Sequence, residues 1–163
     1  MKYIDKKTGL VIRKINYDSK EEIFADIRVI ENSLPDIPLQ GKIPYKFAKY
    51  LQIGEAQRGA HEEKDFNIYV ILDNFGVIST SGVLLWKLNG KTFPIFSAGM
   101  VESNLDKLTE VCGAIIRMLR IQYSRVFIFI LKGKGVLKDK LKLKGFTEET
   151  TRAETWEVDT DAY

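Results

Sequence analysis

Apolar residues recur with two different periods along this chain of 163 residues. Across residues 104–123 they return every three or four positions, the spacing that lays one apolar stripe along a helix. The stripe consists of Leu105, Leu108, Cys112, Ile115, Ile116 and Leu119. Ser103, followed by Asp106 three positions on, forms an acidic variant of the capping box. We therefore predict a helix from Asn104 to Tyr123.

Two near-continuous apolar runs, 93–101 and 125–131, flank this helix. Such runs are typical of strands that are covered on both faces, as in parallel sheets. A parallel pair joined through a helix crosses over with a right hand. Residues 93–131 thus predict one strand–helix–strand unit with adjacent, parallel strands.

The first sixty residues predict a strand and two helices. Residues 10–15 form a short apolar run between turn residues, which favours a strand. Ser19 and Glu22 form a capping box before apolar residues with helical spacing, so a helix should span 20–33. Pro44 suits a helix start and predicts a second helix over about 44–60.

The middle of the chain predicts antiparallel strands at 66–72 and 77–88, followed by the strand at 93–101. Asn89-Gly90 lies between apolar runs, and both residues tolerate the positive φ of a type I′ hairpin turn. Gly82 interrupts a strand pattern, so it indicates either a bulge or a close approach of another group.

After residue 131 come a Lys-Gly-Lys-Gly segment, a short helical stretch at 136–144, the pair Gly145-Phe146 and a closing strand pair that ends at Val158. This order resembles the C-terminal half of the GCN5-related N-acetyltransferase (GNAT) superfamily. With the earlier elements, the chain follows the GNAT order β-α-α-β-β-β-α-β-α-β-β. The resemblance implies one α/β (α+β) domain over residues 1–163 with a mixed sheet. It also implies that the chain is a divergent member of the superfamily, such as the forms found in bacteriophage.

The resemblance also implies a cofactor site. In the family the two strands around the central helix splay apart, the pantetheine arm of acyl-CoA lies in the gap, and its pyrophosphate binds amides at the helix start. A helix N-terminus attracts anions in general, because its N–H groups and dipole face the ligand. Carried over to this chain, acetyl-CoA would lie against Met100, Val101, Ser103, Asn104, Leu105, Asp106 and Lys107, with Lys132 and Lys134 following the second strand.

The chain departs from the family pattern in two places. The family's phosphate turn usually contains glycines, but residues 101–107 contain none, and Asp106 would repel a pyrophosphate. Ser103 and Asp106 could therefore be helix caps alone. The family also commonly has a Tyr as general acid four residues before the Gly of the Gly-Phe pair, where this chain has Leu141.

Glu102 is the candidate catalytic base, because it directly follows the strand at 93–101 and could take a proton from an amine. The alternative is a loop acid that complements the helix dipole. Histidine side chains can titrate near neutral pH, so His61 is a second candidate base, but it stands alone in a predicted loop. Cys112 falls on the apolar stripe, which favours a packed core thiol.

Composition narrows the classes of protein. The content of 45% hydrophobic and 29% charged residues suits a globular domain, and no apolar run approaches the length of a membrane helix. One cysteine and one histidine argue against a zinc site and agree with a reducing, cytoplasmic location. The net charge of +3 does not require a nucleic-acid partner.

Three functions stay open at this point. The first is a GNAT-type transferase that moves an acetyl or related group from CoA to an amine of a small molecule or protein. The second is a GNAT-fold binding or structural module without catalysis. The third, a nucleic-acid-associated protein or GNAT-like base-modifying enzyme, rests on the Lys-rich segment 132–144 alone.

Overall fold

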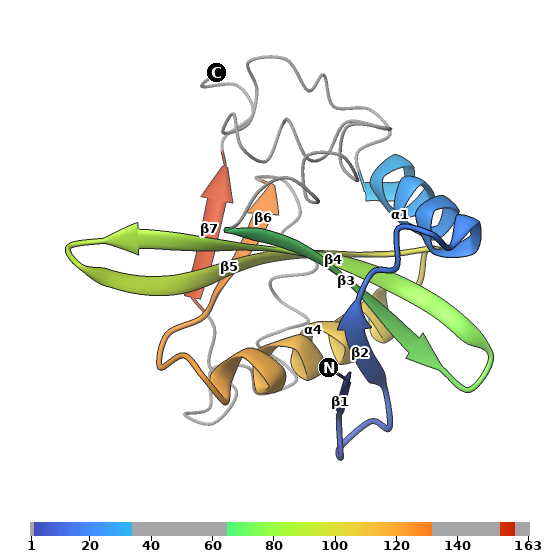
Figure 1. The fold of residues 1–163 in the computed structure, drawn as a ribbon, viewed down its shortest axis with the longest axis horizontal. Helices are drawn as coiled ribbons and strands as arrows, with labels where there is room; N and C mark the ends of the chain where they lie inside the picture. Colours follow the sequence, from blue (N-terminus) through green and yellow to red (C-terminus); the bar gives the residue numbers. More distant parts are fainter. Residues whose placement is uncertain (1, 34–64, 132–153, 159–163) are drawn as a thin grey trace.

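A computed structural model describes residues 2–33, 65–131 and 154–158. In this part of the chain seven strands form one mixed sheet, in the spatial order β1-β2-β3-β4-β5-β6-β7. Neighbouring strands from β1 to β5 are antiparallel, while β5–β6 and β6–β7 are parallel. Figure 1 shows α1 and α4 on opposite sides of the central strands. The strands are β1 (Lys2–Ile4), β2 (Val11–Lys14), β3 (Phe66–Asp73), β4 (Gly76–Leu88), β5 (Lys91–Met100), β6 (Phe127–Leu131) and β7 (Glu154–Val158).

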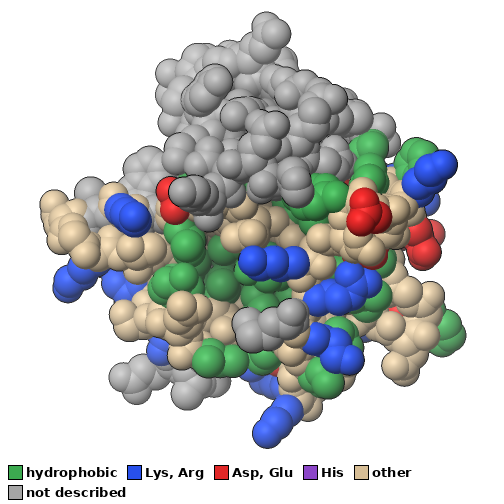
Figure 2. Space-filling model, viewed as in Figure 1, with side chains coloured by type: hydrophobic (Ala, Val, Ile, Leu, Met, Phe, Trp, Pro, Cys, Tyr) green, Lys and Arg blue, Asp and Glu red, His purple; other side chains and the backbone are tan. Residues whose placement is uncertain are grey.

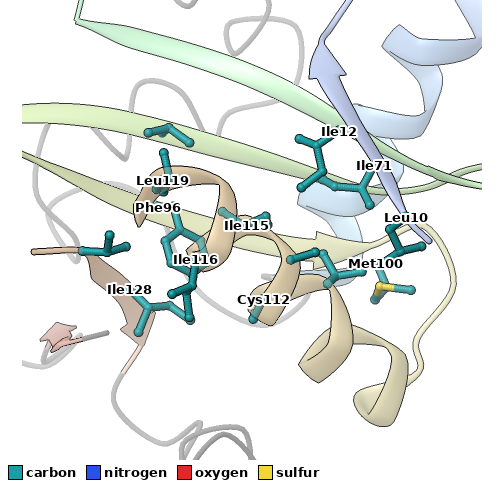
Figure 3. Packing of buried hydrophobic residues seen from close by; sticks show 14 residues of the cluster. Leu10, Ile12, Ile71, Phe96, Met100, Cys112, Ile115, Ile116, Leu119 and Ile128 are labelled. Atoms are coloured by element: carbon teal, nitrogen blue, oxygen red, sulfur yellow. The ribbon is translucent and has the colours of Figure 1, made fainter. Parts of the chain in front are cut away.

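The strand–helix–strand prediction is confirmed. Helix α4 (Leu105–Arg120) lies between β5 and β6 in sequence, and those strands are adjacent and parallel. Of the predicted apolar stripe, Cys112, Ile115 and Ile116 have 0% exposure, whereas Leu105 and Leu108 are partly buried. The fully buried residues pack against residues of β2, β3, β5 and β6, as Figure 3 shows. The helix is shorter than predicted, because Ile121 and Gln122 form a closing turn.

Helix α1 (Lys20–Ser33) has the predicted bounds and covers the other face of the sheet. Ser19 begins it as predicted, since its hydroxyl oxygen accepts from the N–H of Glu22. Its buried residues include Glu22, Ala25, Asp26 and Val29. Ile23 and Ile27 are only partly buried.

The hairpin between β4 and β5 is confirmed, because Asn89 and Gly90 have φ values of 51° and 76°. The glycine at position 82 is explained by the close approach of the Phe66 ring. A Cβ at residue 82 would lie 2.8 Å from Cζ of Phe66, whereas the irregularity in the β3–β4 register falls at Ile71/Leu72. The absence of a side chain at Gly82 therefore leaves room for the Phe66 ring.

Strand β1 was not predicted, and it pairs with β2 at the edge of the sheet. The predicted helices at 44–60 and 136–144, the Gly145-Phe146 pair and the first half of the closing strand pair lie outside the described residues. The full GNAT element order thus stays a prediction. Within the described ranges, none of the helices is long and apolar enough to cross a membrane.

Candidate functional site

Strands β5 and β6 are neighbours for only a short distance. Their register contains two pairs, Ile95 with Phe127 and Phe96 with Ile128. Beyond these pairs β5 stays with β4 as far as Met100, while β6 stays with β7 as far as Leu131. The two strands therefore part at their C-terminal ends, beside the start of α4.

The backbone direction of β5 follows from its hydrogen bonds to β4. The Val101 N–H donates to the Ile78 carbonyl oxygen over 2.9 Å. Residues of an antiparallel strand alternate in the side to which their peptide groups point. Gly99 therefore faces β4, whereas the peptide groups of Ala98 and Met100 point to the side on which β6 has parted.

Three consecutive carbonyl oxygens at the end of β5 accept hydrogen bonds from side chains. Ser79 Oγ, on β4, donates to the Gly99 oxygen over 2.6 Å. Asn32 Nδ2, in the last turn of α1, donates to the oxygens of Met100 (3.2 Å) and Val101 (2.6 Å). The end of β5 is thus held from both faces of the sheet.

The start of α4 is capped differently from the prediction. Asn104 is the N-cap, and its Oδ1 accepts from the Lys107 N–H over 3.0 Å. The predicted Ser103 cap is wrong, because Asn104 has the extended backbone that an N-cap requires (φ −153°, ψ 103°). Lys107 Nζ lies 3.3 Å from a carboxylate oxygen of Glu110, one turn further on.

Comparison with solved structures identifies the fold. An aminoglycoside acetyltransferase from an uncultured soil metagenomic sample matches with a TM-score of 0.58 at 14% identity, over 86% of this chain and 90% of that one. A probable acetyltransferase from Staphylococcus epidermidis ATCC 12228 matches with a TM-score of 0.55 at 14% identity, over 83% of this chain and 82% of that one. The chain has the fold of the GNAT acetyltransferases.

The structural matches all have low sequence identity. A transcriptional regulator from Bacillus halodurans C-125 also matches, with a TM-score of 0.54 at 12% identity, over 84% of this chain and 92% of that one. No family model and no curated protein matches the sequence. Nothing in these likenesses supports the predicted phage-type subgroup.

Most predicted cofactor residues of this GNAT fold lie in one continuous segment. Met100 ends β5 and is buried, Val101 is partly buried, and Ser103, Asn104 and Asp106 are exposed. Leu105 and Lys107, in the first turn of α4, are partly buried. Lys132 and Lys134 lie outside the described residues.

Glu102, the predicted base, is exposed in the bend between β5 and α4. It directly follows Val101, whose carbonyl oxygen Asn32 binds. The carboxylate is therefore carried on backbone that is tied to α1, at the point where β5 and β6 separate. His61 and Leu141 lie outside the described residues.

Cys112 is a core residue in this fold, as predicted. Its side chain is fully buried on α4, and burial raises the pKa of the thiol to about 12. The nucleophilic thiolate is scarce at neutral pH under these conditions. Cys112 thus contributes packing.

Two polar side chains near the site, Asn32 and Asp26, were not predicted from the sequence. Asn32 is a polar residue near a helix end, and its contacts are 68 and 69 residues away in sequence. Asp26 lies between α1 and β4, where the Thr80 hydroxyl donates to its Oδ1 over 2.7 Å. Burial raises the pKa of Asp26 to about 6, and the bond from Thr80 opposes this only in part. The sequence signal for a buried Asp26 was its position between Ile23 and Ile27, on the predicted apolar side of the helix.

Proposed function

We propose that this protein is an acyl-CoA-dependent N-acyltransferase, with acetyl-CoA as donor and an amine as acceptor. The observation that carries the proposal is the parting of β5 and β6 directly beside the N-terminus of α4. Ligands of open α/β sheets bind outside the carboxyl ends of strands, and anions bind at helix starts. Both features coincide at Met100–Asn104, on the fold of acetyltransferases.

The residues at this place suit an acyl-CoA ligand. The peptide group of Ala98 and the N–H of Met100, directed away from β4, would bind the pantetheine arm. The amides around Asn104, Leu105 and Asp106 would bind the pyrophosphate, and Ser103, Lys107, Lys132 and Lys134 would surround it. Asp106 weakens this site, because its charge opposes the phosphates within the first turn.

Bound acyl-CoA would supply a thioester, so that transfer forms a C–N bond, breaks the C–S bond and releases one proton from the amine. Glu102 would accept that proton, directly or through a water, because it extends from the bend at the separation of the strands. A thiolate is a weakly basic leaving group, so a neutral acid at the position of Leu141 is dispensable.

A structural neighbour gives the first acceptor class to test. A second structure of the soil metagenomic aminoglycoside acetyltransferase, with the same TM-score of 0.58, was solved in complex with sisomicin. Aminoglycosides are therefore the first amines to test as acceptors, followed by simpler polyamines and peptides with a free amine.

The test is a calorimetric titration of acetyl-CoA into the wild type and Asp106→Asn at low salt. The variant keeps the shape of the side chain and removes one charge near the helix start. We expect saturable binding by the wild type and two- to fivefold tighter binding by the variant, equivalent to about 0.3–1 kcal/mol. Glu21→Gln, at the exposed first turn of α1, is the control for net charge and should leave the affinity unchanged.

The alternative hypothesis is a GNAT-fold binding or structural module without catalysis, which the glycine-free turn at 101–107 favours. If neither protein binds acetyl-CoA at millimolar concentration, the acyltransferase proposal fails and this module is the better account. The nucleic-acid reading depends on segment 132–144, outside the described residues. On the face seen in Figure 2, the described Lys and Arg side chains are interspersed with hydrophobic and other groups.

A further inference from the structure

Asn32 makes a long-range tie at the point where β5 turns into α4. One side-chain amide donates to two consecutive carbonyl oxygens, those of Met100 and Val101. An amide nitrogen carries two hydrogens, so one can serve each oxygen. The short 2.6 Å contact is the one to Val101, the residue before Glu102.

The backbone that Asn32 holds has few other anchors. The strand pairing of β5 ends at Met100, and the hydrogen bond from Val101 N–H to Ile78 is the last one to β4. Residues 102–104 are exposed and precede the first helical residue of α4. The direction in which the chain leaves the sheet therefore depends strongly on the two Asn32 bonds.

The position of Asn32 is fixed in turn by the buried part of α1. Asp26, 4% exposed, accepts the Thr80 hydroxyl hydrogen bond under the helix. Ala25 and Val29 are buried on the same face. Because Asn32 follows one turn after this face, it reaches the end of β5 from a helix that is firmly packed on β4 and β5.

We propose that Asn32 is a positioning residue of the acyl-CoA site, which holds the Met100–Glu102 backbone in the orientation that binds the ligand. This inference rests on the proposed function. Asn32 acts through the two carbonyl groups, and its side chain needs no contact with the ligand. Without it, the amides at the start of α4 and the Glu102 carboxylate lose their fixed relation to the parted strands.

The experiment compares wild type, Asn32→Asp and Asn32→Gln. Asp keeps the shape but places oxygens against carbonyl oxygens, whereas Gln keeps the donor on a longer side chain. We expect acetyl-CoA binding by Asn32→Asp to be about tenfold weaker, since two hydrogen bonds are lost. Asn32→Gln should recover part of that loss. Arg28→Ala, exposed on the same helix, should bind like the wild type.

Amide hydrogen exchange at residues 101–107 is the second readout. Faster exchange in Asn32→Asp, together with weaker binding, supports the positioning role. Equal affinity of Asn32→Asp and wild type overturns it, even if the variant melts earlier. Weaker binding with unchanged exchange also overturns it, because Asn32 would then touch the ligand. If the wild type binds no acetyl-CoA at all, the proposed function itself fails, and this inference falls with it.

Discussion

The two faces of the sheet are built on different principles. The buried residues of α4 are apolar except for Thr109, whose hydroxyl donates to the Leu105 carbonyl oxygen of the same helix. Under α1 two acids, Glu22 and Asp26, are buried beside Ala25 and Val29. Helix α4 thus holds the sheet together by apolar packing, whereas α1 is oriented by a small number of directional polar bonds.

Asp5 and Asp26, one buried carboxyl from each side of the sheet, differ in the direction of their pKa shifts. Asp5, in the turn after β1, contacts Arg117 of α4 through both oxygens, over 2.8 and 2.9 Å. Burial favours its neutral form, but the hydrogen bonds and charge of Arg117, with bonds from Thr8 and Tyr3, lower the pKa of Asp5 to about 2. At Asp26 the hydrogen bond from the neutral Thr80 hydroxyl lowers the pKa only in part, and burial prevails. A cation beside a buried carboxyl therefore decides in which direction its pKa moves.

The largest effect should come from the apolar side. Ile115→Asp puts a charge at a position with 0% exposure among apolar neighbours, which costs several kcal/mol out of a typical total stability of about 5–15 kcal/mol. We expect the variant to lack a cooperative thermal transition. Ile121→Asp is the control, because Ile121 is 75% exposed just beyond the same helix and should change Tm little. A folded Ile115→Asp protein would show that α4 is not the core helix.

Asp26→Asn should remove the pH dependence of stability that Asp26 contributes. The folded pKa of about 6 lies above the value of about 3.9 in an unfolded chain, so the wild type loses stability as the pH rises from 4 through 6. The variant has no such loss. Its free energy of unfolding relative to the wild type should therefore rise by ~2 kcal/mol between pH 4 and pH 7.

Urea denaturation of both proteins at four pH values measures this difference. Asp18→Asn, exposed before the same helix, serves as the control and should track the wild type. Asp5 should act in the opposite direction, since its lowered pKa gives stability that is lost as the pH falls from about 4 through 2. A flat difference for Asp26→Asn would mean that this carboxyl is not buried beneath α1.

A smaller effect tests the close approach of Gly82 and Phe66. Gly82→Ala places a methyl group 2.8 Å from the Phe66 ring, so the ring or the strand must shift, at a cost of about 1–3 kcal/mol. Phe66→Leu removes the obstructing ring, and the double variant should lose less stability than the sum of the two single variants. Strict additivity in denaturation measurements would contradict the close approach that explains this glycine.

The sequence was informative where local signals agree with burial. The apolar stripe of α4, the Asn89-Gly90 turn and the Ser19 helix start each depend on residues close in sequence, and all three are confirmed. Strand β1 was missed because Lys2–Ile4 is short and only its pairing with β2 makes it a strand. Ser103 and Asn104 are both good caps, so spacing alone could not choose between them.

The site was harder to predict for a physical reason. The parting of β5 and β6 depends on which residues pair across the sheet, and both strands are apolar throughout the region. Asn32 reaches the site from 68 residues away, and no local pattern marks that contact. The candidate residues 100–107 were placed by resemblance to a family, and their role stays a proposal.

Amide chemical-shift mapping with acetyl-CoA tests the central claim most directly, because it shows where the ligand binds. Our account predicts saturable shifts at Ala98, Met100 and residues 101–107. It predicts little change at Arg117, in the last turn of α4, and at Asp5, which Arg117 contacts. Saturable shifts centred elsewhere, or none at millimolar acetyl-CoA, would contradict an acyl-CoA site between the parted strands.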